Sequence, residues 1–258
     1  MRITLKDILK KKGKTPIVMS TAYDAWTAKI VDEAVDCILV GDSLGMVVQG
    51  HDTKIPVTLD DMIYHTRMVI RGSQNAFVIS DLPFLSYQCS ISEAVFSAGQ
   101  CLKEGYAQAV KLEGGEFVVP QIKAISQSGI PVVAHLGLTP QSINVFGKYN
   151  KQAKSKSAGD QLLKDAEMVE EAGANMLVLE NIPYDLAKQV TKHINIPTIG
   201  IGAGGDCDGQ VQVFHDLFGL DPKFTPRHAT KFANCGADML KGIQKFAKEV
   251  RSGKFMSK

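Results

Sequence analysis

Short apolar runs alternate with longer amphipathic segments along the whole chain. Eight runs rich in Val, Ile, Leu and Ala are bounded by Gly, Pro or polar residues, a pattern typical of strands buried on both faces. They are residues 17–22, 37–40, 77–80, 109–112, 131–134, 176–179, 198–204 and 210–214. The pattern therefore predicts eight buried strands.

The segments between these runs carry apolar residues at spacings of three and four, which indicates helices packed on one face. Thr4 with Asp7 and Thr58 with Asp61 have the spacing of capping boxes. We expect a short first helix after Thr4. Further helices are expected at 24–34, 58–72, from Ser90 or Ser92 to near Gly105, 117–127, 161–172, and around Leu186, Val190 and Ile194.

Alternation of this kind, with short connections, implies parallel strands joined by crossover helices. Eight such units in 258 residues favour a closed (β/α)8, or TIM, barrel. The whole chain, 1–258, is predicted to be one barrel domain with an N-terminal helix and a C-terminal helical extension. That extension, residues 227–255, is expected to turn Phe232, Leu240, Ile243 and Phe246 inward. An open doubly wound sheet is the alternative, but no Gly-x-Gly-x-x-Gly follows the first strand.

Titratable residues recur where the predicted strands end. In a barrel of this class the carboxyl ends of the strands form one rim, and active sites lie there. Lys111 and Glu113 are two positions apart on one strand, so both side chains point the same way. The residues placed around this rim are Asp42, Ser43, Asp81, Lys111, Glu113, His135 and Glu180.

Four carboxylates gathered at one rim would repel each other and favour protonation of some of them. A divalent cation relieves this conflict, and an all-oxygen ligand set suits Mg²⁺. One histidine and no cysteine at the rim disfavour zinc.

Each of these residues also has a structural interpretation. An aspartate after a strand is commonly a helix cap, Glu113 could form a plain ion pair with Lys111, and His135 could be a core histidine. Repetition of the same feature on five strands favours function. The glycines at 200, 202 and 204 resemble a phosphate-binding loop, but we favour close backbone packing because the eighth strand offers no second glycine cluster.

Composition excludes several classes of protein. A net charge of +2 implies no nucleic-acid or membrane partner, and no apolar run approaches a membrane span. The first residues lack an apolar signal core. Five widely spaced cysteines without a Cys-x-x-Cys pair indicate reduced thiols and a cytoplasmic location.

Several motifs resemble those of the ketopantoate hydroxymethyltransferase family, from about Leu5 to about Ala233. They are Val40-Gly41-Asp42-Ser43-Leu44-Gly45, Gly50-His51 with Pro56-Val57-Thr58, Asp81-Leu82-Pro83-Phe84, Val110-Lys111-Leu112-Glu113-Gly114-Gly115, His135-Leu136-Gly137-Leu138-Thr139-Pro140-Gln141-Ser142, Leu179-Glu180 and Gly200-Ile201-Gly202-Ala203-Gly204. Two segments differ locally from the family pattern: Thr53-Lys54-Ile55 before Pro56, and the stretch around Arg227 and His228.

The resemblance implies a barrel enzyme of pantothenate biosynthesis. It would transfer a hydroxymethyl group from 5,10-methylenetetrahydrofolate to 3-methyl-2-oxobutanoate, which gives 2-dehydropantoate. The implied Mg²⁺ ligands are Asp42, Asp81 and Glu113, and the implied proton acceptor is Glu180. Substrate contacts fall on Asp42, Ser43, Asp81 and Lys111, to which we add His135. The family implies a homodecamer.

Two other functions remain open. A related metal-dependent barrel lyase or aldolase acting on 2-oxo acids usually carries a Lys-Cys-Gly-His loop, which this chain lacks. A non-catalytic barrel that binds an oxo acid would not require Lys111 or Glu180. We further expect residues 139–158, which are polar and without a clear period, to form a long loop that closes over the site.

Overall fold

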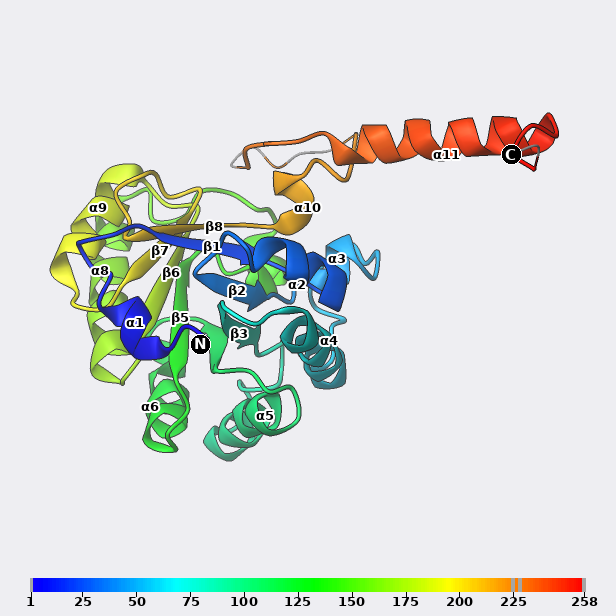
Figure 1. The fold of residues 1–258 in the computed structure, drawn as a ribbon. Helices are drawn as coiled ribbons and strands as arrows, with labels where there is room; N and C mark the ends of the chain where they lie inside the picture. Colours follow the sequence, from blue (N-terminus) through cyan, green and yellow to red (C-terminus); the bar gives the residue numbers. More distant parts are fainter. Residues whose placement is uncertain (1, 224–225, 227–228, 257–258) are drawn as a thin grey trace. The chain divides into compact units, whose positions relative to one another are not determined.

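A closed barrel of eight parallel strands forms the body of the protein, as the computed structural model shows for residues 2–223, 226 and 229–256 (Figure 1). Each strand pairs with the next along the chain, and Ile17 N donates to Asp208 O at the closure. The strands are β1 (Ile17–Thr21), β2 (Cys37–Val40), β3 (Phe77–Asp81), β4 (Ala109–Glu113), β5 (Val132–Gly137), β6 (Met176–Glu180), β7 (Thr198–Ile201) and β8 (Gly209–Gln212). The predicted fold class is confirmed.

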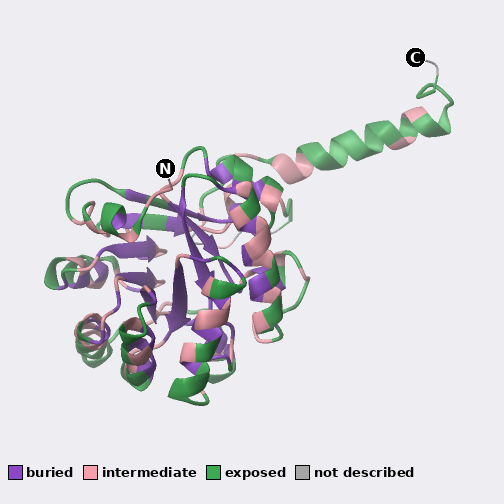
Figure 2. Cartoon of the chain, turned by 60° about the horizontal axis from the view of Figure 1, so that its bottom comes forward, coloured by how far each residue is buried: buried purple, intermediate pink, exposed green. Residues whose placement is uncertain are grey.

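Alternate residues of each strand point into the barrel and out of it. In β4, Ala109 belongs to the inner apolar cluster, whereas Val110 and Leu112 belong to the outer cluster between strands and helices. In β3, Phe77 and Ile79 point inward. Burial on both faces is why these strands read as continuous apolar runs. Figure 2 shows them as a buried centre inside a ring of helices whose outer sides are exposed.

The helices between the strands lie outside the barrel. They are α2 (Ala25–Val31), α4 (Leu59–Gly72), α5 (Ile91–Lys103), α6 (Val119–Gln127), α8 (Lys156–Glu171) and α9 (Tyr184–His193), with the short α3 (Leu44–Val47), α7 (Ile143–Phe146), η1 (Glu116–Val118) and η2 (Pro140–Ser142). The predicted caps Thr58 and Ser90 accept hydrogen bonds from Asp61 N and Glu93 N, both at 3.1 Å. Local capping chemistry thus determines where these helices begin.

The N-terminal helix α1 (Leu5–Leu9) closes the amino-terminal end of the barrel. Ile8 is fully buried in the inner cluster, and Ile3 and Leu5 pack against it. Ile3 N donates to Asn75 O, and Ile3 O accepts from Gln108 Nε2; the two partners lie just before β3 and β4 begin. The interior is therefore reached from the opposite, carboxyl end.

Some predicted boundaries are wrong. The polar segment 139–158 contains η2 and α7, and α8 begins at Lys156 because Ser155 caps it by accepting from Ala158 N at 3.2 Å. β7 ends at Ile201, since Gly202 and Gly204 adopt positive φ. A Cβ on Gly204 would lie 2.8 Å from the Tyr184 ring, which agrees with close packing at these glycines.

Contacts divide the chain into two compact units, Met1–Val211 and Gln212–Lys258, and the single-domain organisation stays a prediction. The second unit holds α10 (Phe214–Leu217) and α11 (Cys235–Arg251). The inward placement of Phe232, Leu240, Ile243 and Phe246 is wrong, because all four are exposed. Leu240, Ile243 and Phe246 do keep helical spacing within α11, whereas Phe232 precedes that helix. Arg227 and His228 lie outside the described residues.

A buried carboxylate at the end of α2 joins this helix to the connection between α4 and β3. Asp32 accepts hydrogen bonds from Ser73 Oγ and from the backbone N–H groups of Gln74, Asn75 and Ala76 at 2.6–3.2 Å. Burial alone would raise its pKa, but these bonds outweigh it and lower the pKa below the usual carboxyl value. The charged form of Asp32 therefore stabilises the fold.

We expect Asp32→Ala to lower the free energy of unfolding by about 2–4 kcal/mol at pH 7, because it leaves several buried donors unpaired. A lowered folded-state pKa means that this stabilisation is complete above about pH 4 and is lost as the pH falls further. Urea unfolding at pH 7 and pH 3.5 measures both effects, and the difference from wild type should shrink at the lower pH. The neighbouring exposed acid provides the control, Glu33→Ala, which should change little; an equal loss in both variants would contradict the role of Asp32.

Candidate active site

The predicted rim residues meet at the carboxyl end of the barrel, and the two-residue repeat of the strands explains how. Asp81 follows Phe77 and Ile79 on the inner side of β3, and Glu180 follows Met176 and Val178 on that of β6. His135 takes the corresponding place after Val133 in β5. Inward positions that are apolar in the lower layers of the barrel thus become charged at its last layer.

Lys111 lies at the centre of this layer. Its Nζ is 3.2 Å from Asp81 Oδ1 and 3.9 Å from Glu113 Oε1. The same Nζ is 3.2 Å from His135 Nδ1. Lys111, Asp81, Glu113 and His135 are all buried. A buried ammonium is stable only with such close anionic partners.

His135 connects this ion cluster to Glu180. Its Nδ1 lies 3.4 Å from Glu113 Oε1, and its Nε2 lies 3.2 Å from Glu180 Oε2. The Glu180 side chain is 12% exposed, against 2% for Glu113. Glu180 therefore lies at ion-pair distance from His135 and is more exposed than Glu113.

Asp42 follows β2 and is fully buried. Its backbone N–H donates to Asp81 Oδ2 at 2.9 Å, and its Oδ2 accepts from Gln141 Nε2 at 2.9 Å. Ser43 lies beside it, with Oγ 2.8 Å from Tyr23 Oη. The structure thus brings all seven predicted site residues to one end of the barrel.

Gln141 and Tyr87 are parts of the site to which sequence reasoning assigned no role. Gln141 donates from its backbone N–H to Glu113 Oε2 and from Nε2 to Leu82 O, both at 2.9 Å. Tyr87 Oη donates to Gln141 Oε1 at 2.7 Å and accepts from Glu113 N at 3.1 Å. Gln141 therefore holds Asp42 and Glu113 in place. Its position within the His135–Ser142 motif was the signal available in the sequence.

Lys54 is a third residue of the site to which the sequence analysis assigned no role. Its Nζ lies 3.1 Å from Asp42 Oδ1 and 4.0 Å from Glu113 Oε1. Burial alone would lower its pKa, but Asp42, Glu113 and further carboxylates outweigh this and raise the pKa well above the usual lysine value. Lys54 is therefore a second ammonium ion at the rim.

The environment separates the two acids that flank Lys111. Burial raises the pKa of Asp81 to about 6, against the opposing charge of Lys111. Burial also opposes ionisation of Glu113, but His135, Lys54 and Lys111 outweigh it and hold its pKa at about 2. For His135, burial and the charge of Lys111 lower the pKa, but Glu113 and Glu180 outweigh them, so that the pKa is raised above the usual histidine value. Such divergent pKa values are typical of sites that handle protons.

The donor set fits a hard cation. Three buried oxygens accept no hydrogen bond from the described residues: Asp42 Oδ1 and Asp81 Oδ1 face lysine ammonium groups, and Glu113 Oε1 lies 3.4 Å from His135 Nδ1. Carboxylate oxygens are the ligands that Mg²⁺ prefers. In the described part of the chain, however, no three Asp, Glu, His or Cys side chains are grouped closely enough to hold a metal together.

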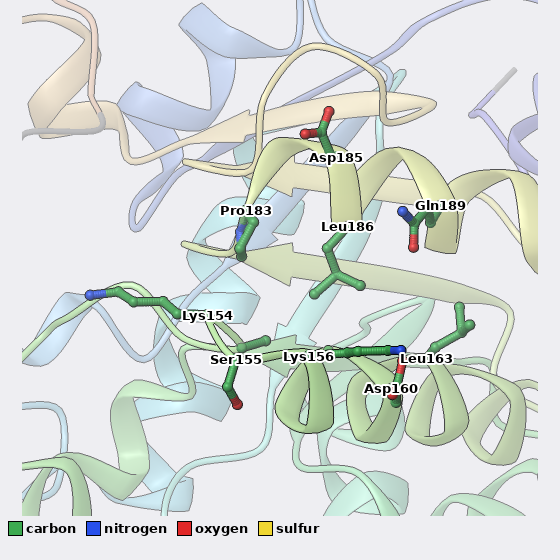
Figure 3. A pocket seen from close by; sticks show the side chains of 11 residues that line it. Lys154, Ser155, Lys156, Asp160, Leu163, Pro183, Asp185, Leu186 and Gln189 are labelled. Atoms are coloured by element: carbon green, nitrogen blue, oxygen red, sulfur yellow. The ribbon is translucent and has the colours of Figure 1, made fainter.

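A separate hollow of about 250 Å³ lies between α8 and α9. Figure 3 shows Lys156, Asp160 and Leu163 from α8 opposite Asp185, Leu186 and Gln189 from α9. Most of these side chains are exposed. The residues of the rim do not line this hollow.

The fold and the buried rim define an α/β-barrel enzyme with its chemistry at the carboxyl ends of the strands. Solved structures of the same fold include a phosphonopyruvate hydrolase complex with oxalate and Mg²⁺, with a TM-score of 0.66, 11% identity and coverage of 100% of this chain and 90% of that chain. A 2,3-dimethylmalate lyase matches with a TM-score of 0.60, 17% identity and coverage of 98% and 89%. At such identities the likeness shows the fold alone.

The chain belongs to the ketopantoate hydroxymethyltransferase family, whose model matches residues 2–258. A Clostridium botulinum 3-methyl-2-oxobutanoate hydroxymethyltransferase is 52% identical over 247 residues, covering 95% of this chain and 90% of the relative. The Moorella thermoacetica enzyme of that name is 50% identical over 257 residues, covering 98% and 95%. The predicted family and enzyme class are confirmed. No described helix is both long and apolar enough to cross a membrane.

The substitution Gln141→Leu tests the positioning network. It keeps the side-chain volume but leaves Asp42 Oδ2, Leu82 O and the Tyr87 hydroxyl without their partner. We expect a loss of about 2–4 kcal/mol in unfolding free energy, measured by urea denaturation, together with reduced activity.

Gln88→Leu is the matched control, since Gln88 is half-buried and contacts the same Gln141 Oε1 at 3.3 Å without reaching a carboxylate. It should cost less than about 1 kcal/mol. Equal losses in the two variants would show that the network does not depend on Gln141.

Proposed function

We propose that this enzyme transfers a hydroxymethyl group from 5,10-methylenetetrahydrofolate to 3-methyl-2-oxobutanoate, forming 2-dehydropantoate for pantothenate biosynthesis. Family membership and the names of relatives at about 50% identity support this substrate. The observation that carries the proposal is His135, whose Nδ1 lies 3.2 Å from the buried Lys111 ammonium and whose Nε2 lies 3.2 Å from the partly exposed Glu180 carboxylate. Together they supply a positive charge for an oxyanion and an acceptor for a proton.

Substrate binding is assigned to Ser43, Lys111 and the acids around them. The Ser43 hydroxyl donates to the substrate carboxylate, and Lys111 lies where the ketone oxygen gains negative charge. Asp42, Asp81 and Glu113 would hold Mg²⁺, which supplies Lewis-acid polarisation of a 2-oxo acid when bound. Three of their buried oxygens accept no hydrogen bond within the described part of the chain and have only ion-pair partners there, which supports this assignment.

Glu180 removes the C3 proton of the oxo acid. A carboxylate is a weak base, so the reaction requires that the developing enolate be stabilised by the nearby positive charge of Lys111. His135 contacts Glu180 through Nε2 and positions its carboxylate. The C3 carbon then forms a bond to the one-carbon unit of the folate, one water is consumed, and tetrahydrofolate leaves.

Bulk water must be kept away from the enolate carbon while its bond to the one-carbon unit forms. Residues 139–158 contribute Gln141 to the carboxylate network at one end, and we propose that the rest of the segment closes over the bound substrates.

The proton-transfer step can be measured without folate. With Mg²⁺ in D₂O, we expect the protein to exchange the C3 proton of 3-methyl-2-oxobutanoate for deuterium. The exchange is measured as the loss of the ¹H NMR signal of that proton. Glu180→Gln should slow this exchange by about 10²–10⁴-fold, because the amide is not a base. The exposed Glu171→Gln variant serves as the control and should exchange at the wild-type rate.

Full exchange by Glu180→Gln would remove Glu180 as the base. No exchange by wild type would favour a barrel that binds an oxo acid without catalysis. Cleavage of a carbon–carbon bond of the substrate, seen in the same spectra, would favour the lyase alternative.

We also propose a cytoplasmic homodecamer. Five free cysteines, none of them in a disulfide, support a reducing compartment. In α11, Met239, Leu240, Ile243, Phe246 and Val250 recur at helical spacing and are all exposed. An apolar face of this kind is typical of a surface that binds another protein.

We expect Ile243→Glu to split the assembly, because it places a charge in this apolar face. The mass measured by size-exclusion chromatography with light scattering should fall from about ten chains to a smaller species. Lys245→Glu, on the polar side of α11, should leave the mass unchanged. A wild-type protein that runs as a monomer would reject the assembly.

A further inference from the structure

Lys54 reaches the rim from outside the strand-end pattern that supplies the other site residues. It lies in the connection between α3 and α4, and its side chain is only 14% exposed. Its Nζ contacts Asp42 Oδ1 at 3.1 Å and approaches Glu113 Oε1 to 4.0 Å. These are two of the three acids assigned to the metal.

The backbone around Lys54 is fixed against α3. His51 N donates to Gly45 O at 2.8 Å, and Val57 N donates to Lys54 O at 3.2 Å. A Cβ on Gly45 would lie 2.4 Å from Val57 Cγ2, so only glycine permits this close approach. The loop therefore delivers the lysine to the rim, while its flexible four-carbon stem leaves the ammonium free to change position.

The charges at the rim give this ammonium a definite role. Lys111, on β4, lies 3.2 Å from Asp81 and 3.9 Å from Glu113, and His135 Nδ1 lies 3.4 Å from Glu113. Among the described residues, only Lys54 forms an ion pair with Asp42. A buried carboxylate without a cation nearby is strongly destabilising. Lys54 therefore supplies the charge that a divalent cation would otherwise supply to Asp42 and Glu113.

We propose that Lys54 is an internal counter-cation that exchanges with the divalent ion. Its ammonium neutralises Asp42 and Glu113 while the metal is absent, and it withdraws from them when the metal binds. The inference rests on the proposed metal site. It has two consequences: the metal-free rim is held together by Lys54, and divalent cations bind more weakly because they must displace an existing ion pair.

The first test compares cation binding. Lys54→Met keeps the length of the side chain and removes its charge. With Mn²⁺ as the probe, we expect isothermal titration calorimetry to show a Kd about tenfold or more below that of wild type, because no ammonium competes. The metal-free variant should also melt at a lower temperature than wild type, and saturating Mn²⁺ should restore most of the difference. Lys148→Met, which removes an exposed lysine of the 139–158 segment, controls for the change in net charge.

The second test uses the wild-type protein and stands even if Lys54→Met does not fold. A lysine-acylating reagent should modify Lys54 slowly in the metal-free protein and several-fold faster with saturating Mg²⁺, as read by peptide mass spectrometry. Lys148 should react equally in both states.

The outcomes separate the two proposals. Equal Mn²⁺ affinity in wild type and Lys54→Met, or metal-independent acylation of Lys54, would overturn the exchange while leaving the metal site intact. Absence of Mn²⁺ binding in both proteins would reject the metal site itself, and the exchange with it.

Discussion

Charge neutralisation at the carboxyl end of the barrel is the constraint on which this structure depends. Asp42, Asp81 and Glu113 are buried there. Lys54 forms an ion pair with Asp42, and Lys111 forms ion pairs with Asp81 and Glu113. A barrel interior would not tolerate these acids alone, since unpaired buried charges are destabilising. Gln141 and Tyr87 add hydrogen bonds that hold Asp42 and Glu113 in place.

The same arrangement explains how a stable fold carries a reactive site. The amino-terminal half of the barrel interior is apolar and is closed by α1 through Ile8. Only inward positions near the carboxyl ends of the strands are charged, so most of the core contributes hydrophobic stability while this end carries chemistry. Among these groups, Glu113 with a pKa of about 2 remains a fixed anion, whereas Glu180 is the more exposed carboxylate and lies 3.2 Å from His135. One carboxylate of the rim therefore serves as a fixed anion, and another is the proposed base.

Several predictions rested on local information and are confirmed for that reason. Thr58 and Ser90 begin their helices because capping needs only residues three positions apart. Lys111 and Glu113 point to the same side because strand geometry repeats every two residues. By contrast, Leu240, Ile243 and Phe246 have the right spacing for a packed helix yet are exposed, since spacing shows that a face is apolar but not what covers it.

The sequence by itself determined the order of strands and helices, the barrel, and which acids, lysine and histidine gather at its rim, because each follows from a periodicity or a strand end. Only the tertiary structure decided the partners of those groups. Gln141 reaches Asp42 across 99 positions of sequence, and Lys54 reaches Glu113 from a connecting loop. Such contacts depend on the path of loops once the barrel has closed, and no local pattern records that path.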